Sequence, residues 1–135
     1  MAMVNHQGGM LLNCYNKTEL ALGYSTIYGD MTGVLSPIGD LTKSGVYQLA
    51  KWIRIEFGLI PEFILERAPT AELRPGQIDP FDYDQVSPAK EQLVMLNQSD
   101  SDLRRSEYKR WQMGVILRVT EKAFGRGRMI PITRR

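Results

Sequence analysis

Two charged residues, Glu19 and Lys43, are the strongest candidates for chemistry in this sequence of 135 residues. Glu19 lies in the segment NKTE and Lys43 in the segment DLTK, each near the expected start of a helix. A carboxylate oxygen is a preferred ligand of Mg²⁺, and a helix N-terminus attracts phosphate. The two side chains therefore predict a frame for a metal-bound phosphate, although the sequence lacks the glycine-rich loop that usually cradles one.

Each of the two residues also has an ordinary structural interpretation. Taken singly, Glu19 is typical of a solvated residue on a short helix, and Lys43 of an exposed lysine. A lysine in the first turn of a helix is slightly unfavourable, because the N-terminal end of the helix dipole is positive. That placement favours a functional reason for Lys43.

Two helices must position this pair. The first is expected from Lys17 to Leu22, because Asn16 is a favourable N-cap residue. The second is expected from about Leu41 to Phe57, with Asp40 as its N-cap and Gly58 at its end. Helical spacing predicts one buried apolar stripe on the second helix, made of Leu41, Val46, Leu49, Ala50, Ile53 and Phe57.

The other elements are expected to be short. A buried strand is predicted from Met10 to Cys14, with Cys14 as a small core residue. A helical turn should follow Pro61. Prolines interrupt residues 69–88, which predicts a long loop of the kind that often forms a functional lid. Helices are then expected at 88–97, with Pro88 in the first turn, and at 101–111, capped by Ser99 or Asp100. From Lys122 the chain is expected to be an extended tail.

Composition excludes several classes of protein. A net charge of +2 is too small to argue for nucleic-acid binding by itself, although basic residues gather after Arg104 and leave a weaker RNA-binding alternative open. One cysteine excludes an internal disulfide framework and fits a reducing cytoplasm. No apolar run approaches the length of a membrane span, so no membrane partner is expected.

Beyond single residues, five segments occur in an ordered series: GYSTIYGD, SPIGDLTKSGVYQLAKW, IPEFILERAPTAELRPGQID, EYKRWQ and KAFGRGRMIPIT. Their order and spacing resemble the C-terminal half of the synthetase domain of glutamine-dependent NAD synthetase. The resemblance covers nearly the whole chain, so residues 1–135 are interpreted as a C-terminal portion of that domain. It implies an α/β class: part of a Rossmann-like, adenine-nucleotide alpha-hydrolase-like fold, mostly helical here with one or two short strands.

The resemblance also implies a reaction. A NAD synthetase is an ATP-dependent amide ligase that activates the carboxylate of deamido-NAD as an adenylate, with pyrophosphate leaving. Ammonia then attacks the adenylate to give NAD. The implied partners of the intact enzyme are ATP, Mg²⁺, deamido-NAD and ammonia, and the implied assembly is a cytoplasmic homodimer.

Carried over residue by residue, the resemblance assigns roles to five positions. Glu19 matches the magnesium-binding glutamate of the family's T-G-N-K-S-E motif. Lys43 matches a lysine that contacts ATP phosphate, and Thr70 an ATP-binding threonine. Lys109 matches a lysine near the dinucleotide substrate. Cys14 stands where the family usually has an ATP-contacting threonine, and its thiol is a weaker hydrogen-bond partner than a hydroxyl. Residues 69–88 correspond to a flexible loop that closes over the active site.

Three further positions depart from the family pattern. Tyr15 stands where glycine is usual, and Ile27 and Val34 replace a lysine and an aspartate that bind deamido-NAD in the ammonia-dependent type. The family's S-G-G-x-D-S phosphate loop is also absent from the sequence. The chain alone is therefore expected to lack synthetase activity, and no catalytic residue is assigned. The alternative is a non-catalytic oligomerisation or interaction module that pairs through exposed apolar helices.

Overall fold

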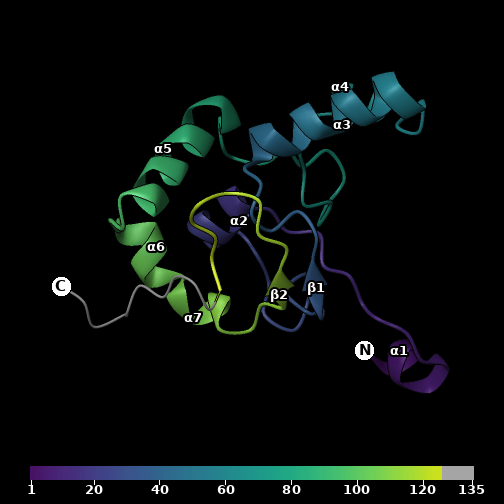
Figure 1. Cartoon of the computed structure of the whole chain (residues 1–135), viewed down its shortest axis with the longest axis horizontal. Coiled ribbons are helices and arrows are strands. Elements are labelled where there is room, and N and C mark those ends of the chain that lie inside the picture. Colours follow the sequence, from purple (N-terminus) through teal and green to yellow (C-terminus); the bar gives the residue numbers. More distant parts are fainter. Residues whose placement is uncertain (126–135) are drawn as a thin grey trace.

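The computed structural model describes residues 1–125, which form a mostly helical structure around a very small parallel sheet (Figure 1). The elements in chain order are α1 (Ala2–Gln7), α2 (Lys17–Leu22), β1 (Leu35–Ser36), α3 (Lys43–Phe57), α4 (Glu62–Glu66), α5 (Tyr83–Met95), α6 (Ser101–Arg105), α7 (Glu107–Arg110) and β2 (Val115–Ile116). The greater part of the expected C-terminal tail, and most of the segment KAFGRGRMIPIT, lies outside the described residues.

The sheet brings together three segments that are far apart in the sequence. β1 pairs with β2 in parallel, with Leu35 opposite Val115, and Leu12 forms an isolated parallel bridge to Leu35. The strand expected from Met10 to Cys14 is therefore reduced to one bridge. Its predicted burial is wrong, because Leu12 is 52% exposed and Cys14 is exposed. Within the described residues this segment pairs with a strand on one side only, at Leu35.

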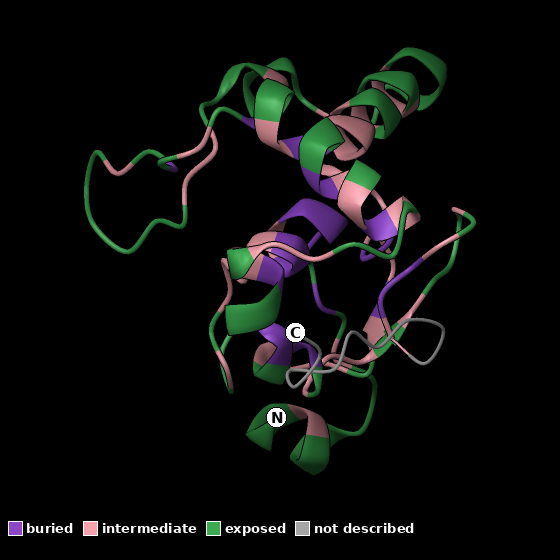
Figure 2. Cartoon of the chain, turned by 90° about the vertical axis from the view of Figure 1, so that its left-hand side faces the viewer, coloured by how far each residue is buried: buried purple, intermediate pink, exposed green. Residues whose placement is uncertain are grey.

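The core is built around α2, which lies at the centre of the molecule (Figure 2). Its residues Leu20 and Ala21 are fully buried, and α3, α5 and α6 pack against it. The remaining buried apolar residues come from many parts of the chain: Tyr15, Met31, Val94, Leu103 and Phe124. A six-residue helix is too short to be stable alone, so α2 depends on this tertiary packing.

The N-terminus of α2 is closed by a capping box, which confirms the prediction of this helix and its cap. The Asn16 side chain accepts a hydrogen bond from the Glu19 backbone N–H at 3.0 Å. In return, Glu19 Oε2 accepts one from the Asn16 backbone N–H, also at 3.0 Å. This reciprocal pair fixes the orientation of the Glu19 carboxylate as well as the start of the helix.

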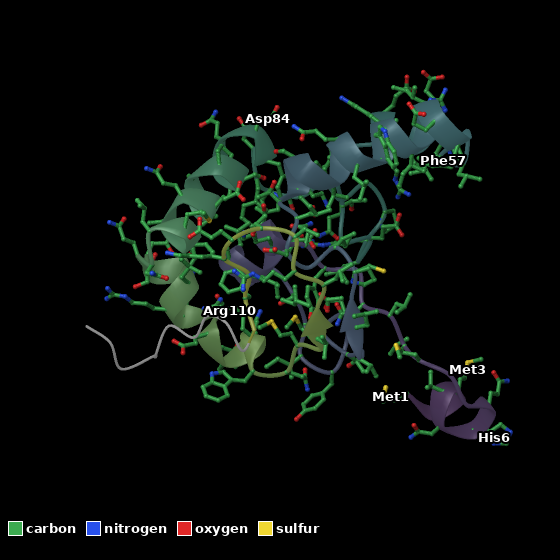
Figure 3. All side chains as sticks on the ribbon, in the orientation of Figure 1. Met1, Met3, His6, Phe57, Asp84 and Arg110 are labelled. Atoms are coloured by element: carbon green, nitrogen blue, oxygen red, sulfur yellow. The ribbon has the colours of Figure 1, made fainter. Side chains whose placement is uncertain are left out.

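α3 differs from its prediction at its start and on its surface. It begins at Lys43, and the Thr42 hydroxyl caps it by accepting a hydrogen bond from the Gly45 N–H at 3.1 Å, so Asp40 is not the cap. Gly58 ends it in the left-handed conformation, as expected. No residue of α3 is buried, so the predicted buried stripe is wrong. The reason is visible in Figure 3, where the end of α3 carrying Phe57 extends away from the rest of the chain.

The C-terminal helices also begin and end elsewhere than expected. α5 starts at Tyr83 with Asp82 as its cap, so Pro88 lies inside the helix rather than in its first turn. The expected loop is shorter for the same reason, because residues 83–88 are helical. The predicted helix at 101–111 is two helices, α6 and α7, which are divided at Ser106. Asp100 caps α6 by accepting from the Leu103 N–H, as one of the two predicted caps.

Asp40 instead forms a buried ion pair with Lys17. Lys17 Nζ lies 3.1 Å from Asp40 Oδ1, and the two side chains are 1% and 0% exposed. Asp40 also accepts hydrogen bonds from the backbone N–H groups of Val119 (2.8 Å) and Thr120 (2.6 Å). Burial by itself would raise the pKa of Asp40, but these hydrogen bonds, with those from the Thr120 hydroxyl and Lys17, hold it below its usual value. The pair therefore ties the loop around residue 120 to α2.

Replacing one partner of this pair should destabilise the fold strongly. In an Asp40→Asn variant, the buried Lys17 would keep only Glu91, at 3.6 Å and 38% exposed, as a counter-charge. Breaking a buried pair costs about 3–5 kcal/mol, and the partly exposed Glu91 places the expected loss at the lower end of that range. Urea unfolding followed by circular dichroism measures the loss. Asp84→Asn, at an exposed carboxylate on α5, is the matched control and should change the unfolding free energy by less than about 0.5 kcal/mol. Equal midpoints for the two variants would contradict the assignment.

Candidate functional site

Glu19 and Lys43, which the sequence singled out, are in direct contact. Lys43 Nζ donates to Glu19 Oε1 at 3.1 Å, and the two side chains are 19% and 17% exposed for lysine and glutamate respectively. The Lys43 backbone N–H also donates to the Thr18 hydroxyl at 3.1 Å. The first turns of α2 and α3 are therefore held together, and the acid and the amine face a common, partly open region.

The donor set fits a contribution to a magnesium site rather than a complete one. Glu19 Oε2 is committed to the capping box, whereas Oε1 faces Lys43 at the partly open side of the pair. Among residues 1–125, no group of three or more His, Cys, Asp or Glu side chains is arranged for a metal ion. Mg²⁺ is commonly held by one or two carboxylates together with phosphate oxygens and water, so a single carboxylate oxygen is consistent with that mode.

An aromatic group covers one side of the Glu19–Lys43 pair. The Tyr83 ring centroid lies 5.1 Å from Lys43 Nζ, which is within the range of a cation–π contact. The Phe81 ring packs edge-on against Tyr83 at 5.9 Å and against Tyr24 at 5.0 Å. The three rings come from the turn after α2, the loop before α5 and the first residue of α5.

Both tyrosines of this group donate to one carboxylate, that of Asp79. Tyr24 Oη donates to Asp79 Oδ1 at 3.0 Å, and Tyr83 Oη donates to Asp79 Oδ2 at 2.8 Å. The pKa of each phenol is raised, first by burial and then by the hydrogen bond to Asp79 and its negative charge. Asp79 was not predicted from the sequence, because it lies in a loop without periodicity and its partners are 55 and 4 positions away.

The other three residues assigned by resemblance are not joined to this pair. Thr70 lies in the loop between α4 and α5, where its hydroxyl accepts from the Glu72 N–H at 3.1 Å. Lys109 Nζ donates to the carbonyl oxygens of Gly23 and Ser25, each at 2.7 Å. Those carbonyls follow the C-terminal end of α2, whereas Glu19 lies in its first turn. Lys109 is therefore at the opposite end of a helix that is roughly 9 Å long.

Cys14 is exposed and stands beside the bridge at Leu12. Its neighbour Tyr15, which replaces the family's usual glycine, is buried and accepts a hydrogen bond from the Ser36 hydroxyl at 2.5 Å. Tyr15 is therefore part of the hydrophobic core, and its hydrogen bond with Ser36 links the first segment of the sheet to β1. In the described part of the chain no helix is long and apolar enough to cross a membrane.

Comparisons with known proteins identify the family of the chain. A family model described as NAD synthase matches residues 1–124. The glutamine-dependent NAD(+) synthetase of Synechocystis sp. is 38% identical over 98% of this chain, and the chain spans 27% of that protein. The corresponding protein of Thermotoga maritima is 35% identical over the whole chain, which again spans 27% of the relative. The chain thus spans about a quarter of the length of the curated relatives it matches.

Solved structures show the same fold. The NMN synthetase from Francisella tularensis superposes with a TM-score of 0.63 and 25% identity, covering 80% of this chain and 47% of that one. A glutamine-dependent NAD(+) synthetase from Cytophaga hutchinsonii superposes with a TM-score of 0.58 over 97% of this chain and 25% of that one, at 18% identity. The mostly helical structure with a small parallel sheet therefore fits the expected partial Rossmann-like class.

The raised pKa values of three phenols, two buried and one half-buried, predict a loss of stability in alkali. Tyr15, Tyr24 and Tyr83 are held protonated in the folded chain, whereas an unfolded tyrosine ionises near pH 10. Their contribution is therefore complete below about pH 10 and is lost as the pH rises above it. Unfolding midpoints in urea between pH 8 and 11.5 measure the loss. A midpoint that stays constant through pH 11 would contradict it.

Proposed function

Because the chain belongs to the NAD synthase family, we propose that it is part of an ATP-dependent amide ligase that converts deamido-NAD to NAD through an adenylated intermediate. The observation that carries this proposal is the contact between Glu19 and Lys43 at the adjoining starts of α2 and α3. It supports the proposal because an acid and an amine so placed can bind opposite charges of one magnesium–nucleotide complex.

In this proposal Glu19 binds the magnesium ion of Mg²⁺·ATP and Lys43 binds its phosphate. The Glu19 Oε1 oxygen is a magnesium ligand, and the capping box holds the carboxylate in place. When bound, Mg²⁺ neutralises phosphate charge and orients the triphosphate. The Lys43 ammonium then contacts a phosphate oxygen and stabilises the charge that develops on pyrophosphate as it leaves. The contact that Lys43 makes with Glu19 would be exchanged for these ligands.

The remaining assigned residues lie apart from this pair and act on other parts of the substrates. Thr70 donates its hydroxyl to a phosphate or ribose oxygen of ATP, and Cys14 lies at a weaker ATP contact. The loop at 69–88, of which residues 83–88 form the start of α5, closes over the site. Closure would exclude water, which would otherwise hydrolyse the adenylate before ammonia attacks it. Lys109 lies near deamido-NAD, where one ammonium proton remains for a substrate oxygen beside its two carbonyl contacts.

The same proposal holds that this chain is inactive on its own. The phosphate loop of the family is not among its 135 residues, and adenylation needs phosphates and metal positioned together. The intact enzyme is a cytoplasmic homodimer in this proposal, and ammonia is the nitrogen donor at the synthetase site.

A second candidate function is a non-catalytic module that forms homo-oligomers through apolar helices. It is favoured by one observation, the large apolar residues exposed on α3, α4 and the turn between them: Leu49, Trp52, Ile55, Phe57, Leu59, Phe63 and Ile64. Large exposed apolar patches on a protein often mark interaction surfaces. Trp52 and Phe57 already pack edge-on with their centroids 5.4 Å apart, so part of the surface is ordered in the single chain.

A chimera tests the catalytic proposal. This chain replaces the matching quarter of the Synechocystis relative, and NAD formation from deamido-NAD, ATP, Mg²⁺ and ammonia is assayed. Lys43→Ala should lower kcat by about 10²–10³-fold, because a charge contact to the leaving group is lost. Lys51→Ala, at an exposed lysine of the same helix, is the matched control and should retain activity. An active chimera that keeps full activity in Lys43→Ala would contradict the role of this lysine.

The isolated chain tests the alternative. Sedimentation equilibrium should give a mass above the 15.4 kDa of one chain if the α3–α4 surface pairs two copies. Ile55→Asp should then return the chain to a monomer, because a carboxylate at the centre of an apolar interface is costly to bury. Leu73→Asp is the control, since both residues are 80% exposed but Leu73 lies in the loop after α4. A monomeric parent at every concentration would count against the module.

A further inference from the structure

The loop between α4 and α5 is closed at its base by a single residue, Asp79. The Asp79 backbone N–H donates to the Pro69 carbonyl at 2.9 Å, which brings the two ends of the loop together. Between these ends, hydrogen bonds join loop residues to one another, such as the Leu73 N–H to Gln77 Oε1 at 2.9 Å. Residues 71–76 are exposed, and the loop stands out from the body of the molecule (Figure 2).

The Asp79 side chain points the other way, into the protein. It is 9% exposed, and its two oxygens accept from Tyr24 and Tyr83, as described above. The Tyr24 phenol also forms a hydrogen bond with the Gln77 side chain, which lowers its otherwise raised pKa. One carboxylate therefore links three parts of the chain: the turn after α2, the base of the loop and the first residue of α5.

The chemistry of this link favours a carboxylate over an amide. Two phenol O–H groups approach from two sides, and an ionised carboxylate offers an acceptor oxygen to each. Hydrogen bonds to an ionised acceptor are also stronger than neutral ones. An asparagine at this position has nearly the same shape but presents one acceptor oxygen and one N–H donor. Only one phenol O–H then keeps its acceptor, and the other phenol can only accept from the amide N–H.

The link reaches the Glu19–Lys43 pair through Tyr83. The ring of Tyr83 is fixed at its hydroxyl by Asp79 and along its edge by Phe81, and its face lies 5.1 Å from Lys43 Nζ. We propose that Asp79 is a positioning residue that latches the base of the 69–79 loop and, through Tyr83, holds the Lys43 ammonium in place. The second half of this statement rests on the function proposed for Lys43, whereas the latch itself does not.

Proteolysis of the loop tests the latch in the isolated chain. Endoproteinase Glu-C cleaves after Glu72, an exposed residue of the loop. Asp79→Asn should raise the cleavage rate about tenfold, since a lost hydrogen bond to a charged group is worth that factor or more. Tyr24→Phe and Tyr83→Phe each remove one hydrogen-bond donor to Asp79 and should raise the cleavage rate about threefold. Asp84→Asn, at an exposed carboxylate five positions further on, is the control and should leave the rate unchanged.

A spectroscopic readout separates a latch from a general loss of structure. In Asp79→Asn, two tyrosines should ionise at lower pH than in the parent chain when absorbance at 295 nm is followed, because both phenols lose the anion that raises their pKa. Unchanged cleavage and an unchanged titration in Asp79→Asn would overturn the proposal. If Asp79→Asn does not fold, Tyr24→Phe and Tyr83→Phe test the proposal instead. Cleavage of both at the rate of the unmodified chain would overturn it.

Binding of Mg²⁺·ATP, measured by calorimetry in the active chimera, tests the link to Lys43. Asp79→Asn should weaken binding about fivefold and Asp84→Asn should not. If Asp79→Asn changes cleavage but leaves the affinity unchanged, the positioning of Lys43 is overturned while the latch stands. If neither the parent chimera nor its variants bind Mg²⁺·ATP, the proposed function fails. The cleavage and titration results in the isolated chain then still test whether Asp79 latches the base of the loop.

Discussion

The buried ion pair between Lys17 and Asp40 is the constraint on which the rest of this structure depends. Two charges removed from water must be fully paired and hydrogen-bonded, and Asp40 achieves this with Lys17, Thr120 and the backbone of Val119. The pair therefore determines where the loop around residue 120 lies. It also places the start of α3 beside α2, since Asp40 comes three positions before Lys43.

The candidate site is a consequence of that arrangement. Once the starts of α2 and α3 are adjacent, the capping box aims one oxygen of Glu19 toward Lys43, and Tyr83 covers the amine from α5. Local helix-capping energetics thus orient a residue proposed to bind metal. A cap of this kind contributes only about 1 kcal/mol to stability, but it fixes a carboxylate that would otherwise sample several rotamers.

α2 and α3 differ in how far the rest of the chain covers them. α2 has six residues, most of them buried. α3 has 15 residues, none of them buried. The apolar spacing of α3 predicts a buried face. In the described part of the chain α3 contacts α2, α4 and α5, yet none of its residues is buried. Its apolar residues are consistent with cover from outside the chain, which fits a sequence that spans about a quarter of its relatives.

The sequence alone determined the local features: the cap at Asn16, the end of α3 at Gly58, and the candidacy of Glu19 and Lys43. These depend on near neighbours, so residue type and spacing carry them. It could not place Asp40, Asp79 or Cys14, or show that α3 stays uncovered. Asp40 suits an N-cap equally well, and only the distant Lys17 and Thr120 decide that it is buried. Tertiary structure decided those positions, because burial and charge pairing depend on segments that meet only after the chain has folded.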